Sequence, residues 1–395
     1  MKKLLLGVLC LIIALSMGVP AENDIRIPEL NLTAKSVPEN EALAFTRALG
    51  LGWNLGNTFD ATGGSWIRNE MDIETAWHGE RTTEALIQAL KDAGFDSIRI
   101  PVSWHDHVDK DFNISKPWLD RVQEVVDWAY SRDMYVIINI HHDCDRKYYY
   151  PSEACLDNSI AYVTAIWTQL GERFKDYGER LIFENLNEPR VKDTPYEWRS
   201  DPSIPQVAAS MQCINVLNQT FVDTVRAAGG NNESRYLMVS GYDAAVGGVT
   251  CDNFVLPKDS ADNKLIISTH AYSPYDFALQ PPTEAGSRST WSILETKDKS
   301  ELALMMNSLY DKFVSKGIPV VMGEFGSRKK GDNLSSRVEH AAFYVAVAAS
   351  RGIPCFWWDN NAFSGNGELF GLIRRGQLTW EYPQIVEAMT TYKLK

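Results

Sequence analysis

The chain has 395 residues, of which 45% are hydrophobic and 23% are charged, so it can bury a sizeable core and is expected to be globular rather than disordered or fibrous. Its formal net charge of −12 argues against a nucleic-acid partner, because too few cations are available to neutralise a run of phosphates. An uncharged polymer would not be repelled.

The first residues have the pattern of a secretory signal peptide. Two lysines precede an apolar run over 4–17, and small residues follow at 19–21, at the usual cleavage spacing. A membrane anchor is the weaker alternative, because the run is shorter than the ~20 residues that cross a bilayer. We therefore expect 1–21 to be removed, 22–40 to form an N-terminal extension and 41–395 to form one domain of a secreted monomer that is not bound to a membrane.

Eight short runs rich in β-branched and aromatic residues recur along the rest of the chain, and longer stretches of helical periodicity separate them. This alternation predicts βα units, and eight units predict a single (β/α)8 barrel of the α/β class. The expected strands are Leu51–Asn57, Ser97–Val102, Met134–His141, Leu181–Glu188, Tyr236–Gly241, Leu265–His270, Pro319–Phe325 and Ile353–Asp359.

Apolar residues three and four apart predict the outer helices. Glycines that suit a C-terminal cap follow several of them, at Gly94, Gly229, Gly317 and Gly352. Two connections, 189–216 and 271–300, exceed the usual loop length, and both follow the carboxyl end of a strand, where such barrels place active sites. The expected helices are Thr82–Ala93, Pro117–Ser131, Ile160–Lys175, Val216–Ala228, Glu301–Ser315 and Arg337–Ser350.

Polar residues end several expected strands. The interior of such a barrel is packed with apolar side chains, so a charge there needs a partner or a purpose. The residues concerned are Arg99, His141, His142, Asp143, Asn187, Glu188, His270 and Glu324.

Glu188 and Glu324 end the fourth and seventh expected strands, which face each other across the barrel. Glycoside hydrolysis needs two such carboxyl groups around one bond, about 5 Å apart for retention and about 6.5 Å or more for inversion. The alternative is that each belongs to a buried ion pair, Glu188 with Arg190 or Glu324 with Arg99. Because Asn187 and Glu188 are adjacent, a bulge or bend must turn both inward.

His141, His142 and Asp143, with Cys144 and Cys155 nearby, could suggest a metal site. Adjacent strand residues face opposite ways, however, and the spacing matches no established ligand pattern. We therefore expect no metal and no cofactor. His141 is interpreted as a hydrogen-bonding group of the pocket, and a satisfied core histidine is the alternative.

Aromatic residues are frequent in the segments expected at the carboxyl ends of the strands. Their flat faces suit the C–H faces of pyranose rings, and ordinary core packing is the alternative for each. The candidates are Trp53, Trp66, Trp77, Trp104, Tyr272, Tyr275, Trp357 and Trp358.

Five cysteines lie outside the apolar N-terminal run, an odd number in a compartment that permits disulfides. Cys355 lies in an apolar strand and is expected to stay free. The favoured pairing joins Cys144 to Cys155 and Cys213 to Cys251, although spacing alone leaves other pairings open.

Seven segments together resemble glycoside hydrolase family 5, in its subfamily 4 of bacterial and anaerobic-fungal cellulases. They run in order from about Phe45 to Trp380: GWNLGNTFDA, IRIPVSW, INIHHD, FENLNEPR, STHAYSPYDFA, GEFG and WWDN. The resemblance implies a secreted, retaining endo-β-1,4-glucanase whose partner is a β-1,4-glucan, with Glu188 as acid/base and Glu324 as nucleophile.

The resemblance also implies supporting residues. Arg99 and Tyr272 would contact Glu324, and Asn187 would hold the sugar 2-hydroxyl. Trp357 would form the stacking floor, often followed by a non-proline cis bond in this family. The others would line the site or bind neighbouring sugars: His141, His270, Asn57 and His142.

Other specificities fit the same scaffold. A xyloglucanase, a mixed-linkage glucanase or a mannanase would differ in loop contacts that the sequence does not define. A non-catalytic glycan-binding barrel is the alternative from another functional class.

Overall fold

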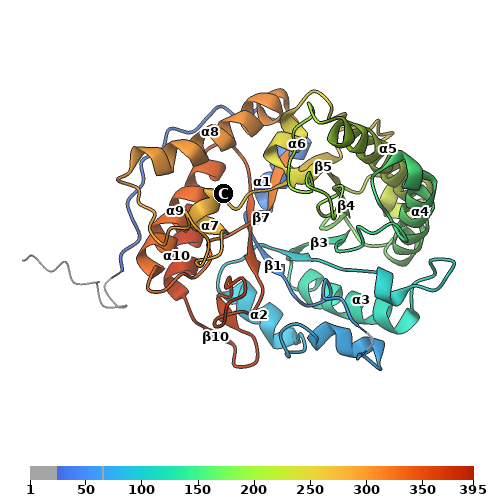
Figure 1. Ribbon diagram of the computed structural model, residues 1–395, viewed down its shortest axis with the longest axis horizontal. Coiled ribbons are helices and arrows are strands. Elements are labelled where there is room, and N and C mark those ends of the chain that lie inside the picture. The colour runs from blue at the N-terminus through green and yellow to red at the C-terminus, as the bar shows by residue number, and fades with distance from the viewer. Residues whose placement is uncertain (1–24, 65) are drawn as a thin grey trace, which may run out of the picture.

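The computed structural model describes residues 25–64 and 66–395 (Figure 1). The predicted signal peptide, 1–21, and the start of the predicted extension, 22–24, lie outside the described residues. Eight parallel strands pair in chain order and β8 pairs back with β1, so the predicted (β/α)8 barrel is confirmed. The strands are β1 Leu51–Leu55, β2 Ser97–Ile100, β3 Tyr135–Ile140, β4 Leu181–Leu186, β5 Leu237–Ala245, β6 Leu265–His270, β7 Val320–Phe325 and β8 Cys355–Asp359.

The predicted outer helices are all present around the barrel. The predicted capping glycines have positive φ, for example 94° at Gly94 and 84° at Gly317, a conformation that glycine adopts without strain. The helices are α2 Glu84–Asp92, α3 Lys116–Tyr130, α4 Leu156–Arg173, α5 Pro205–Ala227, α8 Thr296–Lys312 and α9 Leu334–Ala349.

The predicted length of the 189–216 connection is wrong, because its second half is helical and α5 already begins at Pro205. A proline suits the first helical turn, where its missing N–H has no intrahelical partner to lose. Several short elements were also not predicted: α1 Glu41–Ala48, α6 Val246–Thr250, α7 Tyr275–Ala278, α10 Pro383–Tyr392, the two-residue strands β9 Ile373–Arg374 and β10 Thr379–Trp380, and the 3-10 helices Glu70–Thr75, His105–His107, Glu153–Cys155, Gly230–Glu233 and Val314–Lys316.

The lower part of the barrel interior is an apolar floor. Inward-facing residues of the strands pack there with Phe45 and Leu49 from the α1 region, and Figure 1 shows α1 through the centre of the ring. The Phe45 ring stacks on Tyr236 with centroids 3.6 Å apart. Because this floor closes one end, polar side chains in the layer above it face only the carboxyl ends of the strands. The strand residues of the floor are Ile137, Ile182, Met238, Ile266, Val321 and Phe356.

The upper ends of the strands are irregular. Asn139 of β3 pairs with Glu184 and Ile140 pairs with Leu186, so Asn185 is an extra residue in β4. Similar register shifts occur between β5 and β6, β6 and β7, and β7 and β8. The irregularity expected beside Asn187 is therefore confirmed, and it lets consecutive residues face the barrel mouth.

The described part of the N-terminal extension, 25–40, contains no helix or strand. Its first part contacts α10, where the Tyr392 hydroxyl donates to Pro28 O at 2.6 Å and accepts from Leu30 N at 3.0 Å. Its later part contacts α8, where the Tyr310 hydroxyl donates to Ser36 O at 2.6 Å. None of the described helices is long and apolar enough to cross a membrane.

The predicted disulfides are wrong. Cys144, Cys155, Cys213, Cys251 and Cys355 are all free thiols. Cys144 donates to the carbonyl oxygen of Arg190 at 3.3 Å, and Cys251 Sγ lies 3.9 Å from Met211 Sδ. These thiols act as small packing residues, as predicted for Cys355 alone.

Candidate active site

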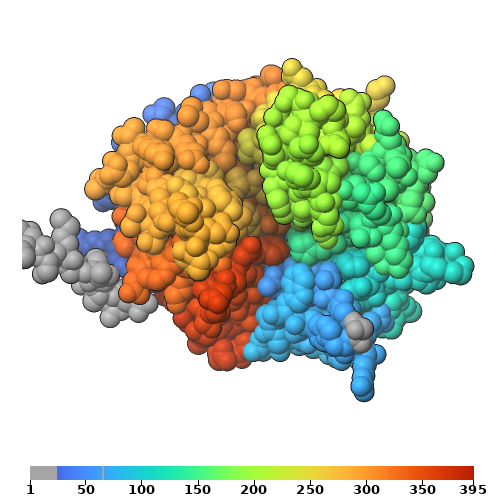
Figure 2. All heavy atoms as spheres, viewed as in Figure 1, coloured from blue at the N-terminus to red at the C-terminus, as the bar shows by residue number. Residues whose placement is uncertain are grey.

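A cleft with a cavity of about 450 Å³ lies at the carboxyl ends of the strands. Figure 2 shows this face hollowed between the green β4–α5 loop and the gold loop after β6. Aromatic, carboxylate and imidazole side chains share its walls. The lining includes Asn57, Trp77, His141, His142, Asn187, Glu188, Arg190, Trp198, Asp243, His270, Tyr272, Tyr275, Glu324, Trp358 and Glu368.

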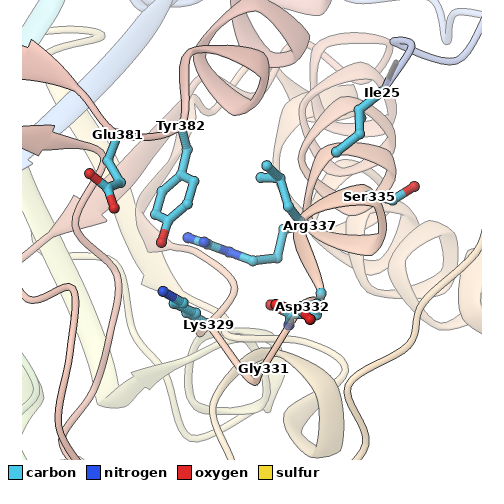
Figure 3. A pocket seen from close by; sticks show the side chains of 10 residues that line it. Ile25, Lys329, Gly331, Asp332, Ser335, Arg337, Glu381 and Tyr382 are labelled. Carbon is cyan, nitrogen blue, oxygen red and sulfur yellow. The ribbon is translucent and has the colours of Figure 1, made fainter. Parts of the chain in front are cut away.

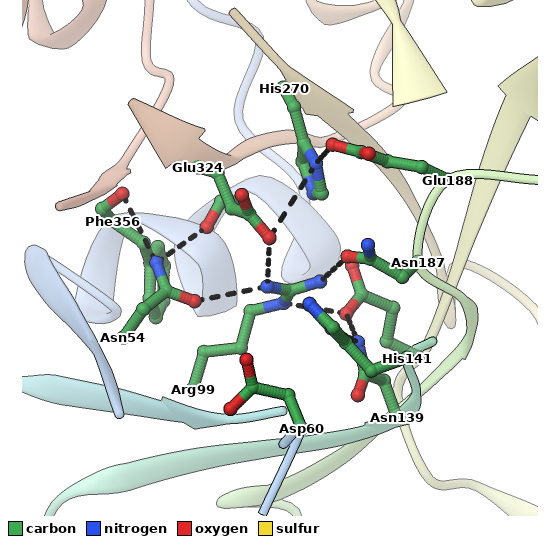
Figure 4. Close-up of polar contacts among 12 residues, drawn as sticks. Asn54, Asp60, Arg99, Asn139, His141, Asn187, Glu188, His270, Glu324 and Phe356 are labelled. Atoms are coloured by element: carbon green, nitrogen blue, oxygen red, sulfur yellow. Dashed lines mark hydrogen bonds and ion pairs between the residues drawn. The ribbon is translucent and has the colours of Figure 1, made fainter. Parts of the chain in front are cut away.

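Two glutamates and one histidine meet at the centre of this cleft. His270 Nδ1 lies 2.9 Å from Glu188 Oε1 and 3.7 Å from Glu324 Oε1 (Figure 4). One carboxylate oxygen of each glutamate and one ring nitrogen lie within 4.8 Å of one another. An approach this close is compatible with the roughly 5 Å between the carboxyl groups of retaining glycosidases, and it is shorter than the roughly 6.5 Å at which inversion begins.

Arg99 of β2 holds the polar layer beneath the two glutamates. Its Nη1 donates to Glu324 Oε1 at 2.7 Å and to Asn54 Oδ1 at 3.0 Å, and its Nη2 donates to Asn187 Oδ1 at 2.7 Å. The Nε donates to Glu184 Oε2 at 2.6 Å. Burial lowers the pKa of Arg99, but Glu184 and Glu324 outweigh this effect, so its pKa is raised. The guanidinium therefore stays charged and orients partners from several strands.

Glu184 was not predicted as a site residue, although it completes this layer. It is fully buried and accepts further hydrogen bonds from Asn139 Nδ2 at 3.0 Å and Ser268 Oγ at 2.5 Å. A signal was present in the sequence, since an acidic residue inside an apolar strand needs a buried cation such as Arg99.

Tyr272, which follows β6, holds the other oxygen of the Glu324 carboxyl group. Its hydroxyl donates to Glu324 Oε2 at 2.9 Å. Burial and the neighbouring carboxylates raise the pKa of Tyr272 well above its ordinary value, so the phenol keeps its proton. With Arg99 on Oε1, both oxygens of Glu324 have a donor, which suits an ionised carboxylate.

Glu188 and His270 form a hydrogen-bonded pair at the centre, with 2.9 Å between Oε1 and Nδ1. Burial raises the pKa of Glu188, but the hydrogen bond and charge of His270 and the charge of Arg190 outweigh burial and lower it. Burial conversely lowers the pKa of His270, and the carboxylates of Glu324 and Glu188 raise it above its ordinary value. Both shifts favour a protonated His270 beside an ionised Glu188, and the two groups titrate as a pair.

The prediction for Trp357 is wrong by one residue. Trp358 pairs with Asn54 of β1 and lines the cleft, where its ring lies parallel to His141 with centroids 5.8 Å apart. Trp357 faces the other side of the strand, packs edge-on against Phe325 and donates from Nε1 to Phe370 O at 3.0 Å. Neighbouring strand residues face opposite ways, and the letters WW do not reveal which one faces inward.

The non-proline cis bond expected after Trp357 is also not found. Within the described ranges the one cis peptide bond joins Ser273 to Pro274.

His141 has a hydrogen-bonding role rather than a metal-binding one. It could form a cluster with Asp60 and His142, since one potential ligand atom from each lies within 4.8 Å of the others. However, Asn139 accepts from Val102 N through Oδ1 and lies 3.1 Å from His141 Nδ1 through Nδ2. Nδ1 therefore accepts, and Nε2 carries the proton as a donor toward the cleft.

The β4–α5 loop forms one wall of the cleft beside Glu188. The Arg190 guanidinium lies 3.9 Å from the centroid of the Trp198 ring, which is 61% exposed. Arg190 also binds Glu197, with Nε 3.0 Å from Oε1, and its Nη1 lies 3.7 Å from Glu188 Oε2. The ion pair considered for Glu188 thus exists, but it leaves the carboxyl group open to the cleft.

Asp243 and Glu368 add two carboxyl groups that were not predicted. Asp243 has φ of 61° and a buried Oδ1 without a described partner. Burial and the charge of Glu188 raise its pKa to about 8. Burial also raises the pKa of Glu368, against the charge of Arg328. Both lie on loops or irregular strand ends, where no periodicity indicates which residues face the cleft.

The other predicted site residues lie where expected. Asn57, His141, His142, Asn187, His270 and Tyr272 line the cleft, while Arg99 lies just beneath it. Among the aromatic candidates, Trp53 and Trp104 are fully buried and Trp66 is exposed, whereas Trp77, Tyr275 and Trp358 join the lining.

Comparison with known proteins places the chain among enzymes of one kind. The profile of the cellulases of glycosyl hydrolase family 5 matches residues 59–364. Endoglucanase A of Clostridium longisporum is 41% identical over 361 residues, which cover 91% of this chain and 67% of the relative.

Solved structures agree with this placement. A family 5 lichenase from Caldicellulosiruptor sp. F32, solved with cellotetraose, is 55% identical with a TM-score of 0.92, covering 93% of this chain and 99% of that one. A "GH5-4 broad specificity endoglucanase" from Ruminococcus champanellensis, with bound cellotriose, is 43% identical with a TM-score of 0.82, covering 90% and 100%.

Proposed function

The chain belongs to glycosyl hydrolase family 5, and from this premise we propose that it is a secreted endo-β-1,4-glucanase that retains anomeric configuration, with Glu188 as acid/base and Glu324 as nucleophile. The relatives named endoglucanases support the activity. The observation that carries the mechanism is that one carboxyl oxygen of Glu188 lies within 4.8 Å of one carboxyl oxygen of Glu324.

In the first step, Glu324 attacks the anomeric carbon of the sugar bound above it. The bond from that carbon to the glycosidic oxygen breaks, and Glu188 donates a proton to this oxygen, so the leaving chain departs as an alcohol. His270 supplies the proton to Glu188, because its Nδ1 lies 2.9 Å from Oε1. Arg99 and Tyr272 aim the attacking carboxylate, one through each oxygen.

In the second step, Glu188 acts as a base. Glu188 gave up its proton in the first step and is now a carboxylate, and ester formation has removed the negative charge of its neighbour Glu324. Glu188 accepts a proton from water, whose oxygen attacks the anomeric carbon from the face that the leaving chain vacated. The ester bond to Glu324 breaks, and the carboxylate is regenerated.

We expect three side chains to hold the reacting sugar. Asn187 binds Arg99 through Oδ1, so its amide nitrogen can donate to the sugar 2-hydroxyl, a bond that strengthens in the transition state. His141 presents its Nε2 proton, and Trp358 offers a flat face for stacking. The leaving chain then lies beyond Glu188, beside Arg190, Trp198 and Asp243.

Covalent trapping tests the assignment. A 2-deoxy-2-fluoro-cellobioside with a good leaving group should label the protein once, on Glu324, because fluorine slows hydrolysis of the ester more than its formation. Peptide mapping by mass spectrometry locates the label. Labelling of another residue, or none in a protein that releases reducing sugar from carboxymethylcellulose, would contradict the mechanism.

The preferred glucan and the destination of the chain need their own measurements. One relative is a lichenase, and another, 35% identical, is a "xyloglucan-specific endo-beta-1,4-glucanase". Initial rates on cellulose, lichenan, xyloglucan, xylan and mannan would rank the substrates. Secretion predicts that the protein recovered from culture medium begins near Ala21 or Glu22, which N-terminal sequencing checks.

A further inference from the structure

A second cavity, of about 290 Å³, lies beside the N-terminus of α9 and shares no lining residue with the cleft (Figure 3). Arg337, Lys329, Tyr382 and the first helical residues Leu334 and Ser335 are part of its lining. Figure 3 shows the Arg337 guanidinium extending into the space between Tyr382 and Lys329.

Arg337 is a buried cation with too few partners. It is 1% exposed, and its Nε donates to Ser327 O at 3.0 Å. Its Nη2 has no hydrogen-bond partner in the part of the chain that the structure describes. The guanidinium lies 4.5 Å from the centroid of the Tyr382 ring. Burial lowers the pKa of Arg337, and the Tyr382 hydroxyl and then Asp359 only partly oppose this effect. Asp359 is itself bound to Arg375 at 3.3 Å. A buried cation in this state is costly unless an acceptor completes it.

Arg235 shows how the same chain completes a buried arginine with its own oxygens. It is also 1% exposed. Its Nε donates to Asn232 Oδ1 at 2.8 Å, Nη1 to Leu181 O at 2.7 Å and Nη2 to Phe174 O at 2.8 Å. Arg337 therefore lacks the set of protein acceptors that surrounds Arg235.

The start of α9 offers further donors to the same space. The N-cap residue, Asn333, makes no side-chain cap, because its Oδ1 accepts from Lys330 N and its Nδ2 donates to Arg328 O. The first amides of this 16-residue helix thus lack a side-chain acceptor, and such amides bind anions. Lys329 adds a second cation to the lining.

Two acidic residues also line the cavity and restrict what fits. Glu381 is bound to Arg374, with 2.6 Å between Oε2 and Nε, and Asp332 is exposed. They disfavour a large polyanion, because it would bring further negative charge against them. We infer that this cavity binds one small oxyanion, of the phosphate, sulfate or carboxylate class, through Arg337, Lys329 and the first amides of α9.

The test measures thermal stability and heat of binding, and it does not depend on catalysis. Inorganic phosphate, sulfate and acetate are titrated separately into the full chain at constant ionic strength set with sodium chloride. A specific site predicts a saturable rise of about 2 °C in Tm for at least one of them. Phosphate or sulfate acting alone identifies a tetrahedral ligand, and acetate acting alone identifies a carboxylate.

Matched variants show whether the effect arises in this cavity. Lys329→Gln should weaken binding several-fold, and Lys329→Glu should abolish it, because the new carboxylate takes the place of the ligand. Lys297→Glu makes the same charge change on the exposed face of α8 and should leave the titration intact. The inference is overturned if none of the three anions gives a saturable effect, or if Lys329→Glu responds like the unmodified chain.

Discussion

Arg99 and Arg337 are both buried, yet their surroundings differ in kind. Arg99 donates to two carboxylates and two carboxamides, drawn from strands that the barrel brings together. Arg337 donates to one backbone oxygen and leaves Nη2 without a described partner. The charged partners raise the pKa of Arg99, whereas burial lowers that of Arg337 to about 10.

The difference separates two ways of using a buried cation. Around Arg99 the chain supplies every acceptor, and these acceptors fix the guanidinium that binds Glu324 before substrate arrives. Around Arg337 the acceptor set is incomplete, which suits a ligand that comes from solution. Substitutions around Arg99 should therefore lower turnover, whether or not they also lower stability, whereas substitutions at an arginine away from the cleft, such as Arg235, should lower stability alone.

The largest effect is expected at the two glutamates. Glu324→Gln and Glu188→Gln keep the shape of the site but remove the nucleophile and the proton carrier. Each should lower kcat by about four orders of magnitude or more while the fold persists. Steady-state rates on cellotetraose measure the loss, and circular dichroism checks the fold. Wild-type turnover in Glu324→Gln would show that Glu324 is not the nucleophile.

Arg99→Lys should have the next largest effect. A lysine keeps the charge but cannot hold Glu324, Asn187 and Glu184 in one planar fork, so kcat should fall by about two to three orders of magnitude. Arg235→Lys is the matched control, since its partners are oxygens away from the cleft. It should reduce the free energy of unfolding by about 2 kcal/mol with kcat unchanged. Equal losses of kcat in the two variants would show that Arg99 does not position the nucleophile more than any buried arginine does.

Glu184→Gln makes Arg99 resemble Arg337 by removing one carboxylate. Breaking this buried pair should cost about 3 kcal/mol of unfolding free energy, measured by urea denaturation. The loosened guanidinium should also lower kcat by about tenfold to a hundredfold. If only stability changes, Glu184 supports the barrel without positioning the nucleophile.

The smallest effect concerns pH. The carboxylates of Glu188 and Glu324 raise the pKa of His270 above its ordinary value. A group with a raised pKa keeps its proton until the pH rises through the folded-state value, so kcat/KM should fall on the alkaline side only above about pH 6.5. His270→Asn removes this proton and should move the alkaline limb to lower pH. An unchanged profile would show that His270 does not hold the transferable proton.

Much of this fold could be predicted from the sequence because its signals are local. Buried parallel strands are short apolar runs, and capping glycines mark where helices end, so all eight strands were predicted. Helix α1 was missed because its apolar face is defined by the barrel floor that it closes, a tertiary contact that no local pattern reveals.

Site residues could be predicted where a motif both identifies the residue and shows that its side chain faces the cleft. Elsewhere the prediction was less accurate. Glu188, Glu324 and Arg99 follow from strand ends in a barrel. The choice between Trp357 and Trp358 depends on the facing of β8, which an irregular register with β7 obscures. The positions of Asp243 and Trp198 in the cleft depend on irregular backbone. Whether two cysteines can pair depends on distances between them that their spacing in the sequence does not give.

The configuration of the first product tests the central claim most directly. Proton NMR during hydrolysis of cellotetraose reports the anomer that is released before mutarotation mixes the two forms. Attack by Glu324 followed by attack of water inverts the anomeric carbon twice, so the β-anomer should appear first. Initial release of the α-anomer would mean a single displacement by water, and the two glutamates could not have the roles assigned to them.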